Sequence, residues 1–480
     1  MKIIATKGAK SHKVRLRNSF FFTPFNITAA AGGHLAYTYM YMSGQPAVLA
    51  IFGISGDLSR RYLLPALAEI KKAGQLPPDF KVLGISRREL SAKEVFDKQT
   101  SALAPLTSFL QINMASSADF KQLKDEIHKL FKKSPQVIFY LVVPPDAVAN
   151  IIKHLGAAGL NGPNVKLLLE KPFGDDLNSA KALVAEIASC FKEEQVYRID
   201  HYLAKGVAQN ISTFLGGNAL FRSVWNRDYI EYIEIVAAEK IGIENRANFY
   251  EPTGALRDFV QSHLLQLTAL TLMEPCPDLF DFSVLPSRRL AALKALDISS
   301  KKLGETVFRG QYRSYRQDAG NPDSTTETFV AIELRSKDPR WQGVPIYLAT
   351  GKKLDQKLTQ IRVHFKKTND SEANTLVLRV QPNAGFELDL WVKKPAFDQE
   401  LDKKTLSFSF DQTFKRLPDA YEQVLVDAIR GDHTLFASSQ EVIESWRIVQ
   451  PVLDYWQGHK DLHIYKDGSD VEQVLNGASK

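Results

Sequence analysis

The distribution of apolar positions divides the 480-residue chain into two parts with different periodicity. In the first part, short and wholly apolar runs alternate with segments in which apolar residues recur at helical spacing. Strands that are apolar on both faces and alternate with helices are typical of a parallel sheet covered on both sides. The six predicted strands are Ala47–Phe52, Val82–Ile85, Phe109–Ile112, Val137–Val143, Val165–Leu169 and Val196–Ile199. The four predicted helices between them are Leu58–Ala73, Phe120–Phe131, Val148–Leu155 and Ser179–Phe191.

The second part begins after about residue 205 and has a period of two. Apolar and polar residues alternate there, which predicts strands with one buried and one polar face, as in an antiparallel sheet. The predicted strands are Glu231–Val236, Ile361–Phe365, Thr375–Val380, Phe386–Val392 and Leu406–Phe410. Helical spacing returns at about 255–273, 418–430 and 440–456. We therefore expect an α/β domain over residues 42–205 and an α+β domain over 206–480 with a large, mainly antiparallel sheet.

Composition changes this picture little. The chain is 44% hydrophobic and 24% charged, which is ordinary for a globular protein with a large core and excludes disorder throughout. The two cysteines, Cys190 and Cys276, exclude a disulfide framework and argue against a cysteine zinc site. We expect no metal site and, from the sparing use of cysteine, a cytoplasmic protein.

Basic residues gather in the first 41 positions. Lys and Arg together number 61 against 54 Asp and Glu, which gives a formal net charge of +7. Six of the basic residues and none of the acidic ones lie in residues 1–41, so the rest of the chain carries only +1. Because a nucleic-acid binding surface needs basic residues on the folded body, the distribution argues against a nucleic-acid partner.

Residues 1–41 are interpreted as an extension outside the fold. Met40 and Met42 offer alternative starts, and the sequence from Met42 runs directly into the first predicted strand. We expect the extension to be disordered or to reflect an upstream start site. A targeting peptide is the alternative, since the segment is basic and free of acidic residues. No run of about 18 apolar residues occurs in the sequence, so we expect no membrane-spanning helix.

A glycine-containing loop, residues 53–58 (GISGDL), connects the first predicted strand to the first helix. Glycines in such a loop let the backbone approach a pyrophosphate, and the start of the helix adds free N–H groups. The loop predicts a dinucleotide site in a Rossmann-like domain, with a tight turn that binds nothing as the alternative. The second predicted strand leads into Arg87, which would pair with the 2′-phosphate of NADP unless it is only a solvated surface residue.

Polar residues capable of chemistry follow two further predicted strands. Residues 170–174 (EKPFG) come after one strand, and residues 198–205 (RIDHYLAK) overlap the end of another. Ligands of open α/β sheets bind at the carboxyl ends of strands. A third segment, residues 254–266 (GALRDFVQSHLLQ), is predicted to be helical and holds both Asp258 and His263. These three segments define a candidate active site.

These motifs resemble those of the glucose-6-phosphate 1-dehydrogenase family. The resemblance rests on GISGDL, EKPFG, RIDHYLAK, GIENRANFYEPTGALRDFVQSHLLQ, TVFRGQY, TETFVA, WQGVPIYLATGKKL and PDAYEQVLVDAIRGDHTLF, which follow the family's order from about residue 47 to 456. It implies that a Rossmann-like N-terminal domain precedes the α+β C-terminal domain. It further implies oxidation of glucose 6-phosphate to 6-phosphoglucono-δ-lactone with hydride transfer to NADP, which opens the oxidative pentose phosphate pathway, and a homodimer or homotetramer formed through the sheet domain.

The resemblance also implies roles for individual residues. His263 would be the general base that takes the proton of the C1 hydroxyl, and Asp200 would hydrogen-bond His263 and stabilise its charged form. Lys171 would lie between substrate and cofactor. The residues expected to bind the phosphate are His201, Tyr202, Lys205 and Lys357. Those expected to bind the sugar hydroxyls are Glu239, Asp258 and Lys352. Those expected to bind NADP are Gly53, Ser55, Gly56, Asp57, Leu58, Arg87 and Lys171.

The chain departs from the family pattern near these positions. Tyr62 stands where the family has a lysine, Ala204 and Gly206 replace Gly and Glu, and Ser262 replaces Asn. The expected base and its partner are retained, so the chemical step is preserved while substrate affinity is in question. Two alternatives follow: a catalytically impaired regulatory paralogue, and a dehydrogenase of another hexose or hexose phosphate.

Overall fold

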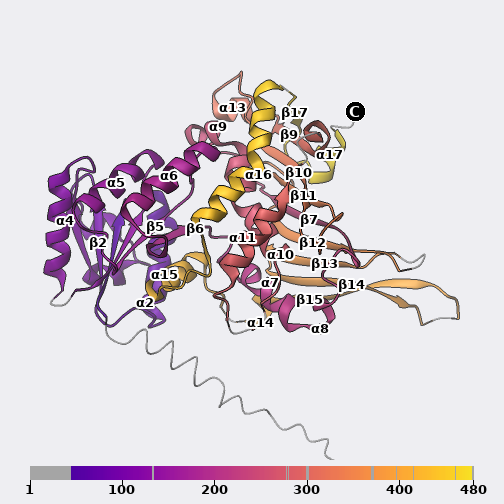
Figure 1. Cartoon of the computed structure of the whole chain (residues 1–480), viewed down its shortest axis with the longest axis horizontal. Coiled ribbons are helices and arrows are strands. Elements are labelled where there is room, and N and C mark those ends of the chain that lie inside the picture. The colour runs from indigo at the N-terminus through magenta and orange to yellow at the C-terminus, as the bar shows by residue number, and fades with distance from the viewer. Residues whose placement is uncertain are drawn as a thin grey trace, which may run out of the picture. The chain divides into compact units, whose positions relative to one another are not determined.

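The computed structural model describes residues 45–131, 134–276, 278, 281–298, 302–368, 372–395, 397–414, 416–459 and 461–477. These residues hold two sheets, one of seven strands and one of ten, with helices packed on them (Figure 1). The expectations for residues 1–41 lie outside the described residues.

The first sheet has the strand order β16-β6-β5-β4-β1-β2-β3. Its parallel strands are β1 (Ala47–Phe52), β2 (Phe80–Ser86), β3 (Thr107–Gln111), β4 (Gln136–Leu141), β5 (Val165–Leu169) and β6 (Val196–Ile199). All six predicted strands are confirmed, and β1, β5 and β6 have the predicted bounds. Every residue of β1 is buried, as expected for a strand covered on both faces.

Local sequence signals set the helices of this half. They are η1 (Ser59–Leu63), α2 (Leu64–Lys72), α3 (Ala92–Val95), η2 (Ser101–Leu106), α4 (Ser117–Leu130), α5 (Pro145–Ala157), α6 (Leu177–Cys190) and η3 (Glu193–Gln195). The four predicted helices are confirmed. α5 begins at Pro145, before its predicted start, because the fixed φ of proline suits the first turn. α6 begins at a capping box in which Asp176 and Ser179 bond each other's backbone N–H groups.

The second sheet is mainly antiparallel, with the order β15-β14-β13-β12-β7-β11-β10-β9-β17 and β8 paired to β10. Its strands are β7 (Ile230–Ala238), β8 (Leu296–Asp297), β9 (Val307–Tyr312), β10 (Phe329–Ser336), β11 (Ile346–Gly351), β12 (Leu358–Phe365), β13 (Thr375–Gln381), β14 (Gly385–Lys393), β15 (Leu401–Ser409) and β17 (His463–Tyr465). Four of the predicted strands are confirmed within β7 and β12 to β14. The fifth, Leu406–Phe410, overlaps the end of β15 and extends one residue beyond it, and the expected fold class is confirmed. The pairs β7–β11 and β9–β17 are parallel. Of these four strands, β9, β11 and β17 were not predicted.

Helices cover the second sheet and join the two sheets. They are α7 (Gly206–Gly217), α8 (Ala219–Arg222), α9 (Ala247–Ala255), η4 (Leu256–Leu264), α10 (Leu265–Leu272), α11 (Leu285–Ala295), α12 (Leu303–Thr306), α13 (Tyr315–Ala319), α14 (Phe410–Thr413), α15 (Ala420–Arg430), α16 (Ser439–Gly458) and α17 (Val471–Gly477). η4 packs on β7, β10 and β11, and every residue of α10 is buried. Among the described residues, no helix combines the length and apolarity needed to cross a membrane.

The chain returns to the first sheet late in its sequence. α15 packs against α2, and β16 (Phe436–Ala437) pairs antiparallel with β6 at the sheet edge. α16 then contacts α6, α11 and η4, so it lies between the elements of both sheets (Figure 1). The first sheet and its covering helices are therefore built from two distant parts of the sequence.

A buried ion pair fixes this returning segment. Arg289 on α11 donates to Glu441 on α16 at 2.8 Å, and both side chains are fully buried. The same guanidinium donates to the carbonyl oxygens of Thr434 at 2.7 Å and Phe436 at 2.8 Å. Its hydrogen-bonding capacity is therefore met by the segment around β16.

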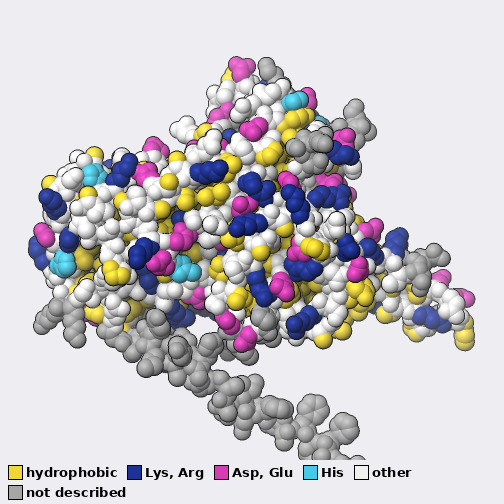
Figure 2. Space-filling view, viewed as in Figure 1, with side chains coloured by type: hydrophobic (Ala, Val, Ile, Leu, Met, Phe, Trp, Pro, Cys, Tyr) yellow, Lys and Arg dark blue, Asp and Glu magenta, His cyan; other side chains and the backbone are white. Residues whose placement is uncertain are grey.

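Acidic and basic side chains are interspersed on the face of the molecule drawn in Figure 2. Lys and Arg lie beside Asp and Glu over the elements of both sheets on that face. Mixed charge of this kind gives no extended field of one sign on that face.

Candidate active site

Glycine geometry shapes the loop after β1. Gly53 has a φ of +84°, and a Cβ there would lie 2.1 Å from the carbonyl oxygen of Val142, so the position requires glycine. The Gly56 N–H and the Ser59 hydroxyl both donate to the Gly53 carbonyl at 2.9 Å. The predicted cofactor residues of this loop are Gly53, Ser55, Gly56, Asp57 and Leu58. The structure places them at the carboxyl end of β1, where dinucleotides bind in such sheets.

Arg87 follows β2 directly and is exposed. Its neighbour Arg88 is engaged in an ion pair with Glu94 at 2.7 Å. Among the residues that the structure describes, no carboxylate pairs with Arg87. Its guanidinium is thus available beside the neighbouring strand end, in keeping with the predicted cofactor contact.

A histidine and an aspartate from distant segments meet in the interior. Asp200 follows β6, and His263 lies on η4. Nδ1 of His263 is 2.6 Å from Oδ1 of Asp200, and both residues are at least 96% buried. The Tyr202 N–H also donates to Oδ1 of Asp200, at 3.0 Å. The predicted pairing of these two residues is therefore present in the structure.

The protonation states of this pair follow from burial and proximity. Burial opposes ionisation of Asp200, but the adjacent imidazole outweighs it and lowers the pKa of Asp200 to about 2. Burial also lowers the pKa of His263 below 6.5, and the charge of Asp200 opposes that change only in part. His263 is therefore neutral at pH 7, with Nδ1–H donated to Asp200 and Nε2 left as an acceptor.

The start of η4 is fixed by a second glycine. Gly254 has a φ of +65°, and a Cβ there would lie 2.3 Å from Oε1 of Glu327. The same carboxylate accepts the N–H of Leu256 at 3.0 Å, which satisfies a free donor at the beginning of η4. η4 itself is π-helical, a geometry often found at functional sites. The contact sets the direction from which η4 presents Asp258 and His263.

Two lysine–carboxylate pairs lie in the same region. Lys171, after β5, donates to Oδ1 of Asp258 at 3.1 Å, and Lys352 donates to Oε2 of Glu239 at 2.5 Å. Glu239 and Lys352 follow β7 and β11, which are parallel neighbours, so the sheet register brings them together. Although Asp258 is buried, the ammonium groups of Lys171 and Lys352 lower its pKa to about 2. Four of the predicted substrate residues thus form two ion pairs.

Of the remaining predicted substrate residues, His201, Tyr202 and Lys205 lie just before α7, and Lys357 lies just before β12. The Tyr202 ring stacks on His263 with centroids 4.3 Å apart, and the His201 ring meets His263 edge-on at 4.7 Å. Lys205 occupies the N-cap of α7, and its Nζ lies 5.2 Å from the Tyr202 ring centroid. Burial lowers the pKa of Lys205, the charge of Asp419 opposes this change, and the charge of exposed Lys357 adds to it. Two cations therefore lie close enough to influence each other near a helix N-terminus, with the carboxylate of Asp419 also nearby, and this excess of positive charge suits an anion.

Several polar groups around this site were not predicted from the sequence. Gln381 donates to the Tyr202 hydroxyl at 3.0 Å and to the Thr359 hydroxyl at 3.2 Å. Tyr140 donates to Glu170 at 2.6 Å, and burial raises the pKa of Glu170 to about 7. Glu170 lies in the EKPFG motif and could have been selected, whereas nothing in the local sequence marks Gln381.

The departure at Tyr62 has a clear structural context. Its ring is half exposed and stacks on Tyr421 of α15 at 5.6 Å, and Tyr421 stacks in turn on His201 at 6.3 Å. The neighbouring arginines do not supply a cation in its place. Arg60 donates to the carbonyl of Glu94, and Arg61 pairs with Asp57 at 3.4 Å. An aromatic column therefore connects η1 with His201, which packs against His263.

The other departures fit their surroundings. Ala204 is buried and its φ is not positive, so no glycine is needed there. Gly206 begins α7 with open space where a Cβ would be. The Ser262 hydroxyl donates to the carbonyl of Asp258 at 3.3 Å, within the same helix. None of the three disturbs the contact between His263 and Asp200.

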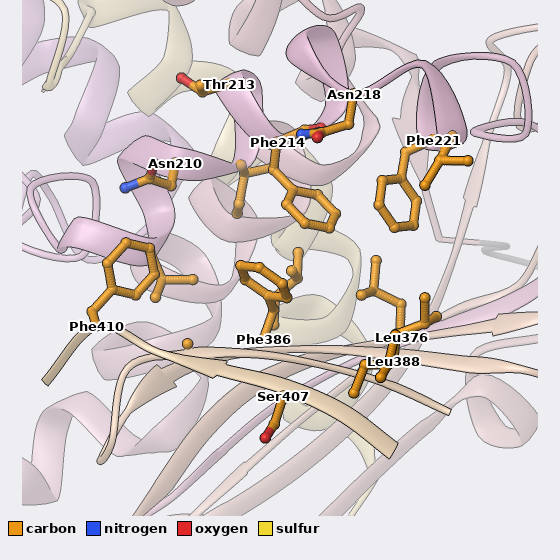
Figure 3. Close-up of a pocket in the computed structure, with 16 residues that line it drawn as sticks. Asn210, Thr213, Phe214, Asn218, Phe221, Leu376, Phe386, Leu388, Ser407 and Phe410 are labelled. Atoms are coloured by element: carbon orange, nitrogen blue, oxygen red, sulfur yellow. The ribbon is translucent and has the colours of Figure 1, made fainter. Parts of the chain in front are cut away.

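A separate apolar cavity of about 360 Å³ lies between α7–α8 and β13–β15. Figure 3 shows Phe214 and Phe221 on the helices facing Phe386 and Leu388 on the strands. The polar side chains at its edge, such as Asn210, are neutral. The cavity therefore offers no acid, base or charge for catalysis.

The parallel sheet with its glycine loop and the buried histidine–aspartate pair define a dehydrogenase with a Rossmann-like dinucleotide domain. Two family descriptions match in succession: "Glucose-6-phosphate dehydrogenase, NAD binding domain" over residues 50–210 and "Glucose-6-phosphate dehydrogenase, C-terminal domain" over residues 213–476. The chain belongs to the glucose-6-phosphate dehydrogenase family.

Named relatives and solved structures agree with this membership. The glucose-6-phosphate 1-dehydrogenase of Aggregatibacter actinomycetemcomitans is 35% identical over 467 residues, covering 89% of this chain and 94% of that protein. That of Borreliella burgdorferi is 37% identical over 444 residues, covering 85% and 91%. A structure described as glucose-6-phosphate dehydrogenase in complex with its substrate glucose-6-phosphate has a TM-score of 0.84 at 30% identity, covering 91% and 97%. The Mycobacterium avium enzyme has a TM-score of 0.78 at 32% identity, covering 89% and 95%.

Proposed function

We propose that the protein oxidises glucose 6-phosphate at C1 to 6-phosphoglucono-δ-lactone with NADP as hydride acceptor, the first step of the oxidative pentose phosphate pathway. The observation that carries the proposal is the buried His263–Asp200 pair, which lies beside the cations at α7. The relatives named for this activity, and the solved relative described with glucose-6-phosphate, support the same substrate.

His263 acts as the general base. Its Nε2 takes the proton of the C1 hydroxyl while the electron pair of the C1–H bond leaves as hydride, and the C1–O bond becomes a carbonyl. Asp200, held at 2.6 Å from Nδ1, stabilises the imidazolium that forms. Because burial lowers the pKa of His263, the base is already neutral at physiological pH. Proton removal at C1 therefore needs no further activation of the imidazole.

The anionic end of the substrate binds at the start of α7. Lys205 and Lys357 supply charge, His201 and Tyr202 supply ring and hydroxyl donors, and the helix N-terminus adds its dipole. The sugar hydroxyls bind to Glu239, Asp258 and Lys352. Because these groups already form ion pairs, little reorganisation is needed when the sugar binds. Lys171 lies between the sugar and the cofactor.

The loop of residues 53–58 fits a dinucleotide. Gly53 lets the loop turn beside the carbonyl of Val142, where a Cβ would collide, and η1 begins a few residues later. Arg87 favours NADP over NAD, because an exposed guanidinium at this strand end can pair with the 2′-phosphate. When bound, the nicotinamide ring accepts the hydride from C1.

The assembly and location are further parts of the proposal. We infer a homodimer or homotetramer that associates through the second sheet in the cytoplasm. Tyr232 stacks on His364 at 4.1 Å on this sheet, and Tyr347 beside them is 40% exposed. Such aromatic side chains are common at protein interfaces, which supports association through this face.

The decisive experiment is an activity assay on the purified full chain. NADPH formation is followed with glucose 6-phosphate and NADP, and in parallel with NAD, glucose and other hexose phosphates. We expect turnover with glucose 6-phosphate that falls by at least a hundredfold in His263→Asn, because the variant lacks the base. The matched control is His128→Asn on the exposed surface of α4, which should retain full activity.

Other outcomes would point to the alternatives. A folded protein that binds NADP without turnover on any sugar would indicate the regulatory paralogue. Turnover only with another hexose or hexose phosphate would indicate a different substrate. The intact His263–Asp200 contact gives neither alternative support.

A further inference from the structure

Tyr250 on α9 is a buried aromatic residue in contact with a proposed substrate group. Its side chain is 3% exposed. Nζ of Lys352 lies 5.0 Å from its ring centroid, which is cation–π geometry. The same Lys352 pairs with Glu239, so one lysine connects the tyrosine ring with a carboxylate proposed to bind the sugar.

The hydroxyl of Tyr250 has no internal partner. Among the described residues, no side-chain or backbone group forms a hydrogen bond with it. Burial raises the pKa of Tyr250 well above its usual range, and the charges of the nearby carboxylates Asp258, Glu327 and Glu239 raise it further. The phenol is therefore a neutral donor beside carboxylates that are proposed to bind hydroxyl groups. The hydroxyl is thus the one polar atom of a side chain that is otherwise buried, and it has no partner in the described part of the fold, so it can bond a ligand.

Its surroundings differ from those of the other buried tyrosines nearby. Tyr315, whose ring meets that of Tyr250 at 6.2 Å, donates to Glu251 at 2.6 Å. Tyr465 donates to the carbonyl of Lys352 at 2.7 Å. Both of these hydroxyls serve the fold, whereas the Tyr250 hydroxyl is left for a group that the protein itself does not provide.

We propose that Tyr250 is a specificity-determining residue, whose ring holds Lys352 in place and whose hydroxyl binds a secondary hydroxyl of the sugar. This inference rests on the proposed function and deepens it. The ring orients Lys352 toward Glu239 before substrate arrives. The hydroxyl then discriminates among sugars by whether a partner oxygen is present at one carbon of the ring.

The test is a set of steady-state measurements on Tyr250→Phe and Tyr250→Leu in the full chain. Phe keeps the ring under Lys352 and removes one neutral hydrogen bond, so KM for glucose 6-phosphate should rise about three- to tenfold with kcat nearly unchanged. Leu also removes the ring, so KM should rise further. The 2-, 3- and 4-deoxyglucose 6-phosphates are then compared as substrates. One of them should give the same KM with the wild type and with Tyr250→Phe, because that sugar already lacks the oxygen that the Tyr250 hydroxyl bonds.

The control is Tyr315→Phe, which removes a hydroxyl that serves the fold. We expect its Tm to fall while KM stays unchanged, and the Tm of Tyr250→Phe to stay unchanged or rise. An unchanged KM in Tyr250→Phe would overturn the inference, and so would an equal loss with every deoxy sugar. Failure of the proposed function would show in the wild type itself, as absence of turnover with glucose 6-phosphate.

Discussion

Two buried charged clusters in this protein are built in opposite ways. Around Arg289 and Glu441, the guanidinium bonds a carboxylate and two backbone carbonyls, and both side chains are fully buried. Around His263, by contrast, Oδ2 of Asp200 is buried without a partner among the described residues. The hydroxyl of Tyr250, whose side chain is 3% exposed, has no hydrogen-bond partner among them either. The first cluster uses its hydrogen-bonding capacity within the fold. The second contains hydrogen-bonding atoms that have no partner within the fold, as expected of a site that binds a ligand rather than of a structural support.

Substitution of Asp200 by Asn tests the second cluster most severely. The amide leaves the geometry nearly intact but removes the charge that stabilises imidazolium, so kcat should fall about 10³-fold. NADPH formation measures the loss, and a thermal melt shows whether the fold is retained. A decrease smaller than tenfold would mean that His263 does not become charged during turnover.

Substitution of Arg289 by Met tests the first cluster. It leaves Glu441 buried and unpaired, so the free energy of unfolding should fall by about 3–5 kcal/mol. Because the pair lies outside the active site, KM and kcat per folded molecule should not change. Denaturant unfolding and an activity assay below the transition measure both. The double variant with Glu441→Leu should recover part of the free energy of unfolding. If Arg289→Met loses activity without losing stability, the pair is not the structural support described above.

Substitution of Lys205 by Gln tests the region before α7 that is proposed to bind the phosphate. Loss of one charge-assisted hydrogen bond should raise KM for glucose 6-phosphate about ten- to a hundredfold and change kcat much less. The control is Lys121→Gln on the exposed surface of α4, where KM should stay constant. An effect on kcat alone would place the phosphate elsewhere.

The pH dependence is the smallest effect in this series. His263 must be neutral to accept a proton, and burial lowers its pKa below 6.5. The value of kcat/KM should therefore rise with pH to a plateau, with its midpoint below 6.5 and a change of at most tenfold per pH unit. In Asp200→Asn the midpoint should move lower still, because the charge of Asp200 raises the pKa of His263. A midpoint above 6.5 would show that another group controls the profile.

The first sheet could be predicted well because its signals are local. Each parallel strand is an apolar run that ends at a turn, and β1, β5 and β6 match their predicted bounds. β16 could not be found in this way, since two residues paired at a sheet edge have no periodicity. β11 was missed for a related reason, because two of the last three residues of its sequence IYLATG, Ala349 and Gly351, have low strand propensity.

The site was predicted in its residue types more than in its geometry. Asp200 and His263 stand in recognisable motifs, but their contact at 2.6 Å depends on packing between η4 and the end of β6. The pair of Glu239 with Lys352 depends on the parallel register of β7 with β11, one strand of which was not predicted. Tyr250 and Gln381 have no chemical signature in sequence, because each acquires its meaning from the groups around it.

The late return of the chain to the first sheet has a consequence for synthesis. β6 and the start of α7 leave the ribosome long before α15 and β16, which cover α2 and close the sheet edge. Until then the edge of β6 has unpaired backbone groups, and His201 lacks the Tyr421 ring that stacks on it. Contacts between parts so distant in sequence form slowly and expose aggregation-prone intermediates. The nascent protein should therefore depend on chaperones until residues 420–437 have emerged, and an amber codon just before them should yield insoluble chain.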